Sequence, residues 1–121
     1  MTVIVGGHST LGNIRVDRVL QTYKNGVYIA QISVWDSDTN TNTNTNQYIA
    51  KTNNSEMLMF PATWTADRIL VEIDSAYSNQ VDDLDAVRQA EGTWAGISHS
   101  GVRIEGYRYP EFTAFPSSTQ E

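Results

Sequence analysis

The sequence predicts an α+β fold, in which small antiparallel β-sheets pack with one or two helices. Apolar and polar residues alternate in several short segments, which is typical of strands that bury one face. Residues 65–77 instead repeat their apolar side chains with helical spacing. The strands occur in runs before and after this segment, and such runs favour α+β over repeated βαβ units.

The first predicted element is a β-hairpin over residues 14–35. Both halves alternate apolar and polar residues, and the Asn25-Gly26 pair between them supplies the positive φ angles of a tight turn. Residues 39–46 repeat threonine and asparagine, which bury little apolar surface, so we expect a solvated low-complexity loop there. Residues 47–51 are predicted to return from this loop as a short strand.

The second half is predicted to contain the helices and the last strands. An apolar run at residues 57–60 is followed by Thr65, the expected N-cap of a helix whose apolar residues share one face. A second, shorter helix is expected over residues 82–90. Alternation returns at residues 102–107, and residues 112–115 are predicted to form a last short strand.

Length, charge and composition limit the classes of function. A chain of 121 residues fits a single domain. The formal net charge of −6 argues against general nucleic-acid binding, but it allows an enzyme that grips one or two phosphates. The absence of cysteine excludes thiol nucleophiles, disulfides and cysteine-based zinc sites. No membrane span and no signal peptide are expected, and the cellular location stays undetermined.

The two histidines, His8 and His99, lie in polar segments flanked by glycine or serine. Such settings favour function over the structural role that a lone histidine more often has. RNA cleavage without a metal needs a base for the ribose 2′-OH, an acid for the leaving oxygen, and a cation. Two imidazoles and a lysine fit these roles. The candidate residues are His8, Lys51 and His99 for catalysis, and Ser55, Ser98 and Ser100 for substrate binding.

Five groups of segments carry a resemblance in order and spacing. They are Gly6-Gly7-His8-Ser9 with residues 12–16, residues 25–30, Lys51-Thr52-Asn53-Asn54 with residues 59–61 and Trp64-Thr65, residues 94–98 with 100–107, and residues 113–116. Together they resemble the bacterial branch of the EndoU endoribonuclease family, which is related to the coronavirus uridylate-specific endoribonuclease and to bacterial toxin domains. The resemblance covers nearly the whole chain and implies one EndoU-like catalytic domain over residues 1–121.

The resemblance implies a metal-independent endoribonuclease that acts on single-stranded RNA. Transesterification by the 2′-OH would leave a 2′,3′-cyclic phosphate, often after uridine. His8 matches the second family histidine and Lys51 matches the lysine that supports the phosphate. Ser55 matches a base-reading serine of the coronavirus relative, and Ser98 and Ser100 match a pair that lines the site. No cofactor is required, although a divalent cation modulates some relatives.

The sequence also departs from the family pattern. The family's first histidine normally lies well before the position of His8, but only seven residues precede His8 here. Phe115 stands where relatives often have tyrosine. Three explanations are open: the chain is a truncated domain, His99 supplies the second imidazole, or the site is degenerate and the protein binds without cutting.

The same resemblance suggests the partners. We expect single-stranded RNA as the substrate and no membrane. Many bacterial relatives are toxin domains paired with an immunity protein, so such a protein is a second expected partner. A homodimer is a further expectation, because a shortened N-terminus would leave a surface to be covered.

Overall fold

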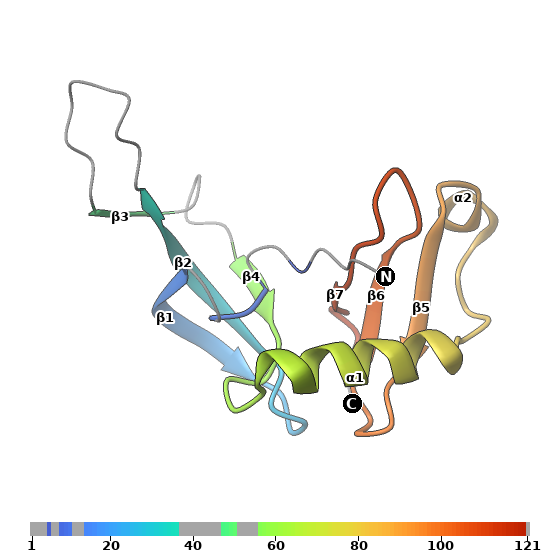
Figure 1. The fold of residues 1–121 in the computed structure, drawn as a ribbon, viewed down its shortest axis with the longest axis horizontal. Helices are drawn as coiled ribbons and strands as arrows, with labels where there is room; N and C mark the ends of the chain where they lie inside the picture. Colours follow the sequence, from blue (N-terminus) through green and yellow to red (C-terminus); the bar gives the residue numbers. More distant parts are fainter. Residues whose placement is uncertain (1–4, 6–7, 11–13, 37–46, 51–55, 121) are drawn as a thin grey trace.

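The computed structural model describes residues 5, 8–10, 14–36, 47–50 and 56–120. In this part of the chain, two antiparallel sheets and two helices confirm the predicted α+β class (Figure 1). The elements, in chain order, are β1 (Ile14–Thr22), β2 (Tyr28–Asp36), β3 (Gln47–Ala50), β4 (Glu56–Met59), α1 (Ala66–Ser78), α2 (Ala86–Ala90), β5 (Thr93–Ile97), β6 (Arg103–Tyr107) and β7 (Phe115–Pro116). Neither helix is long and apolar enough to cross a membrane. The predicted loop over residues 39–46 lies outside the described residues.

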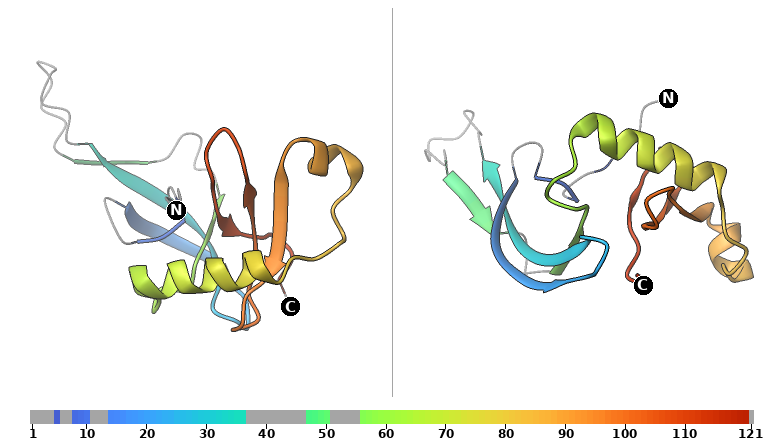
Figure 2. Two further views of the ribbon diagram at one scale, coloured as in Figure 1. Left: turned by 45° about the vertical axis from the view of Figure 1, so that its right-hand side comes forward. Right: turned by 90° about the horizontal axis from the view of Figure 1, so that it is seen from below.

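The N-terminal sheet is built around β2. This strand pairs with β1 along one edge and with both β3 and β4 along the other. The predicted hairpin turn is confirmed, with Gly26 at φ 94° and the Asn25 side chain accepting a hydrogen bond from the Val27 amide at 3.1 Å. Two register shifts interrupt the pairing of β1 with β2. Such irregularities bend a strand, and the sheet is strongly curved (Figure 2).

The C-terminal sheet has the strand order β5-β6-β7. Side chains alternate between its faces, so Val102 and Ile104 project to one side and Glu105 and Tyr107 to the other. Val102 and Ile104 belong to the buried cluster that includes the apolar residues of α1. We call the side that carries Glu105 and Tyr107 the far face, because it lies opposite α1.

Helix α1 begins as predicted. Thr65 is its N-cap, and the Thr65 hydroxyl accepts a hydrogen bond from the Arg68 amide at 3.1 Å. The helix runs across both halves of the molecule (Figure 1). Its buried face joins a single apolar cluster with residues from the first half and from the C-terminal sheet, namely Val27, Phe60, Trp64, Trp94, Val102, Ile104 and Ala114. This shared core fixes the two sheets relative to each other.

Two predicted elements have different bounds. The second helix spans Ala86–Ala90 rather than residues 82–90, because the Asp85 carboxylate caps it by accepting from the Arg88 amide at 2.8 Å. The last strand spans Phe115–Pro116 rather than residues 112–115. The Thr113 amide donates to the Tyr107 carbonyl at 2.9 Å, which makes the preceding residues a turn.

Gly96 has no room for a side chain, because an ideal Cβ would lie 1.8 Å from the Ala76 carbonyl oxygen of α1. We expect Gly96→Ala to lower the free energy of unfolding by about 3 kcal/mol, since overpacking forces the helix away from β5. Urea denaturation measures the loss. The control is Gly101→Ala, where φ is +83° but no atom lies within 4 Å, so backbone strain alone should cost about 1–2 kcal/mol. Equal losses would contradict the steric argument.

Candidate functional site

His8 is held against β4 by two hydrogen bonds. Its carbonyl oxygen accepts from the Phe60 amide at 2.8 Å, and its Nδ1 lies 2.6 Å from the carbonyl oxygen of Leu58. A carbonyl oxygen only accepts, so Nδ1 carries the hydrogen. The neutral ring then has its lone pair on Nε2. The local structure therefore fixes the tautomer in which Nε2 is the basic nitrogen.

The rings of Phe115 and Tyr107 lie in a row beside His8 on the far face of the C-terminal sheet. The His8 and Phe115 ring centroids are 5.5 Å apart, and those of Phe115 and Tyr107 are 6.1 Å apart. Phe115 pairs with Glu105 in the sheet, and directly paired residues project to the same face. Tyr107 is 43% exposed, so a planar ligand can reach this aromatic row. The imidazole from the N-terminal half thus lies beside rings of the C-terminal sheet.

The other predicted residues of the described chain gather around Glu72 on α1. Glu72 is fully buried, and its Oε2 accepts from the Ser100 hydroxyl at 2.7 Å and from Arg68 Nε at 3.2 Å. His99 Nε2 lies 3.1 Å from the same oxygen. Ser100 and His99 belong to the turn between β5 and β6, and Arg68 lies one turn before Glu72 on α1. These contacts tie the β5–β6 turn to the helix.

The His99 ring also contacts Ser75, with Nδ1 at 3.2 Å from the hydroxyl oxygen. The Ser75 hydroxyl donates its own hydrogen to the Glu72 carbonyl at 2.9 Å. The other ring nitrogen, Nε2, faces the Glu72 carboxylate. The ring therefore bridges two residues of α1.

Surrounding groups set the ionisation of Glu72. Burial would raise the pKa of its carboxyl group, because the charged form is poorly solvated there. Hydrogen bonds from Ser98, Ser100 and Arg68 outweigh this effect, and with the charge of His99 they lower the pKa below its usual 4.5. The Ser98 hydroxyl helps to lower the pKa of Glu72, although Glu72 Oε1 makes no hydrogen bond of ordinary geometry among the described residues. The buried carboxyl group is thus a charged anchor.

The structure does not bring the two predicted histidines together. His8 lies beside Phe115 on the far face, whereas His99 is bound to α1, which covers the opposite face. The prediction that His99 supplies the second imidazole is therefore not supported by these contacts. Ser98 and Ser100 share the environment of His99 rather than that of His8.

Two further predicted residues, Lys51 and Ser55, lie outside the described part of the chain and stay predictions. The sequence interpretation missed Glu72, although a signal was present. Glu72 lies three residues after Ile69 and one before Ile73, so it falls on the apolar face of α1. A carboxylate on a buried face requires partners, and those partners turned out to be the predicted residues of the β5–β6 turn.

Much of the positive charge is neutralised locally. Four arginines form ion pairs with carboxylates, and these pairs are Arg15–Asp17, Arg68–Glu72, Arg88–Glu105 and Arg103–Asp83. In the residues that the structure describes, no group of three or more His, Cys, Asp or Glu side chains has a geometry that would hold a metal ion.

Comparison with known proteins adds one finding. The model of a family described as bacterial EndoU nuclease matches residues 2–118, which is nearly the whole chain. This match agrees with the resemblance carried by the sequence segments. No curated protein and no solved structure matches the chain.

Acid should weaken the fold through Glu72. Because the pKa of this group is lower in the folded chain than in the unfolded one, its contribution to stability is present above about pH 4.5 and is lost as the pH falls through the folded value. Glu72→Gln should cost about 1–3 kcal/mol at pH 7 and flatten the acid limb of the stability profile. Urea unfolding between neutral and acid pH tests this. Asp74→Asn, on the exposed side of α1, should leave the slope unchanged.

Proposed function

The chain belongs to the bacterial EndoU nuclease family, and we propose that it is a metal-independent endoribonuclease that cleaves single-stranded RNA. Family membership supports the nuclease activity, and the choice of RNA and of the cleavage chemistry is our proposal. The supporting observation is the position of His8, whose ring has a fixed tautomer and lies 5.5 Å from the Phe115 ring. An imidazole beside an aromatic platform is suited to act on a nucleotide whose base is stacked.

In the proposed reaction, His8 is the general base. Its Nε2 takes the proton from the ribose 2′-OH while Nδ1–H stays bonded to the Leu58 carbonyl, which stabilises the imidazolium that forms. The 2′-oxygen bonds to phosphorus, and the bond from phosphorus to the 5′-oxygen breaks. The products are a 2′,3′-cyclic phosphate and a 5′-hydroxyl. Lys51 is proposed to neutralise the charge that accumulates on the phosphoryl oxygens.

The leaving 5′-oxygen takes its proton from water in this proposal. The other histidine, His99, bonds to Ser75 and Glu72 of α1, so we assign it a structural role. General acid catalysis contributes about 10²–10⁴-fold, and a site with one imidazole should be slower than a site with two by a similar factor. Slow turnover is thus an expected property of this chain.

Phe115 and Tyr107 are the proposed base platform. Their rings lie 6.1 Å apart, and both project from the far face beside His8. Stacking on one aromatic ring is worth about 1–3 kcal/mol per base. A uridine at the cleaved bond is the preference that the family resemblance implies, and we propose it for this chain. Stacking alone accepts every base, so the preference requires polar contacts in addition.

Mutation of the proposed catalytic groups should abolish or slow cleavage of a short uridine-containing RNA in EDTA. His8→Ala and Lys51→Ala should each lower the rate by about 10²-fold or more, because each removes a group that acts in the transition state. Quantification of cyclic-phosphate ends measures the rate. His99→Ala is the matched control and should retain cleavage, provided that circular dichroism shows an intact fold.

A large rate loss in His99→Ala, with the fold intact, would overturn the structural assignment of His99. RNA binding without cleavage by the natural chain would favour the alternative, a catalytically degenerate EndoU-like binding module. A 2′-deoxy substitution at the cleaved position should block the reaction, since the attacking hydroxyl is absent. Cleavage of that substrate would exclude the transesterification mechanism.

Replacement of Phe115 should separate stacking from packing. Phe115→Leu keeps an apolar side chain but removes the ring, and we expect the KM for RNA to rise about fivefold or more. Phe115→Tyr keeps the ring and should bind as the natural chain does. Steady-state kinetics with a fluorescent RNA measures both variants. Equal KM values for the Leu and Tyr variants would contradict the stacking role.

A further inference from the structure

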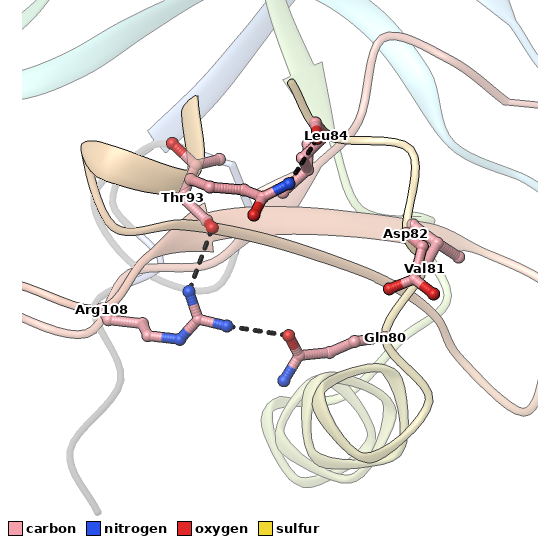
Figure 3. Close-up of a pocket in the computed structure, with 7 residues that line it drawn as sticks. Gln80, Val81, Asp82, Leu84, Thr93 and Arg108 are labelled. Carbon is pink, nitrogen blue, oxygen red and sulfur yellow. Dashed lines mark hydrogen bonds between the residues drawn. The ribbon is translucent and has the colours of Figure 1, made fainter. Parts of the chain in front are cut away.

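A polar pocket opens at the edge of β5, where the segment between α1 and α2 leaves that strand (Figure 3). Its volume is about 260 Å³. Gln80 and Asp82 line it from the segment between α1 and α2, and Arg108 approaches from the end of β6. The catalytic proposal makes no use of these residues.

The guanidinium of Arg108 is fixed in this pocket by neutral acceptors. It donates to the Thr93 carbonyl at 3.1 Å, to the Gln80 side-chain oxygen at 2.8 Å and to the Tyr77 hydroxyl at 3.3 Å. It also lies 5.8 Å from the centroid of the Tyr77 ring. A guanidinium has five N–H donors, so two remain after these three bonds. In the described part of the chain, Arg108 has no ion pair.

Acceptors complete the lining. Asp82 is exposed and contributes a carboxylate. Gln89 donates through its amide nitrogen to the Leu84 carbonyl at 2.6 Å, which leaves its side-chain oxygen as an acceptor. The pocket is therefore lined by Arg108, whose Nη1 and Nη2 each keep one further N–H, and by acceptors from Asp82 and Gln89. A ligand that matches it needs acceptors on one edge and donors on another.

Guanine has this arrangement in one flat ring system. Its O6 and N7 accept from arginine, and its amino and imino N–H groups donate to a carboxylate. Each other base lacks one of these edges: adenine offers an amino group where guanine has O6, and the pyrimidines have no N7. We propose that this pocket binds a guanine base of the RNA, at a nucleotide near the cleaved bond.

The position of the pocket supports this proposal, which rests on the proposed function. Thr93 lines the pocket and pairs directly with Tyr107 across the sheet. The Tyr107 ring lies 6.1 Å from Phe115, and Phe115 lies 5.5 Å from His8. The Arg108 guanidinium itself is held on the α1 side, by Tyr77 and Gln80. A single strand that passes His8 and the two aromatic rings must therefore continue past the edge of β5 to reach the pocket. The pocket would select the sequence next to the cleavage site.

The test measures binding apart from cleavage. Short 2′-O-methyl oligouridines lack the attacking hydroxyl, and a single guanosine is moved through them one position at a time. Fluorescence anisotropy with the full chain should show one position that binds about tenfold more tightly than oligouridine, as expected for a bidentate base contact. Inosine at that position, which lacks the amino group, should lose part of the gain.

Asp82→Asn should abolish the positional preference, because it removes the acceptor charge and leaves the three bonds of Arg108 intact. Asp74→Asn is the matched control, since it changes the same charge on the exposed side of α1 and should keep the preference. Equal binding at every position, or a preference that survives Asp82→Asn, would overturn the guanine site.

The two proposals can fail separately. A guanine preference without cleavage of natural RNA would leave the pocket in place and remove the nuclease mechanism. Cleavage of natural RNA without any guanine effect would remove the guanine site and leave the nuclease mechanism in place. Binding of free guanosine monophosphate at the pocket, detected by loss of affinity in Asp82→Asn, would support the base contact without the RNA path.

Discussion

The packing of α1 against both sheets is the constraint on which the rest of the structure depends. One apolar cluster contains Phe60 and Trp64 from the first half and Trp94 and Ile104 from the C-terminal sheet. β5 approaches the helix so closely that only glycine fits at position 96. Because this core sets how the sheets face each other, it also sets the distance between groups that belong to different sheets.

The candidate site is such a pair of groups. His8 is bound to β4, and Phe115 belongs to β7, so neither sheet alone contains both rings. Their 5.5 Å separation is a consequence of the shared core rather than of local sequence. The loops of either sheet can therefore change while the core keeps the imidazole beside the Phe115 ring.

Local signals in the sequence predicted most of the fold. Asn25-Gly26 predicted the hairpin turn, and Thr65 predicted the start of α1. Both signals are local, because turn and cap preferences depend on a few neighbouring residues. The bounds of α2 were wrong because the helix starts after a local cap at Asp85, which the prediction passed over. The segment before the cap is held by the pair of Asp83 with Arg103 from a distant strand, and no local pattern reveals that contact.

The candidate site was predictable by residue type and not by geometry. The sequence singled out His8, which lies beside Phe115, and its catalytic role stays a prediction. It also grouped His99 and Ser100 with His8, but these residues meet Glu72 instead, because the packing of the β5–β6 turn on α1 decides their surroundings. Lys51 and Ser55 remain predictions.

The ion pairs of the arginines have a consequence for how RNA affinity should respond to salt. Among the seven lysines and arginines that the structure describes, four are paired with carboxylates, so few of them remain to displace counterions from a phosphate backbone. For single strands, the logarithm of affinity falls with the logarithm of salt concentration by about 0.7 per neutralised phosphate. The slope for this chain should therefore be shallow, and stacking and base contacts should supply most of the binding free energy.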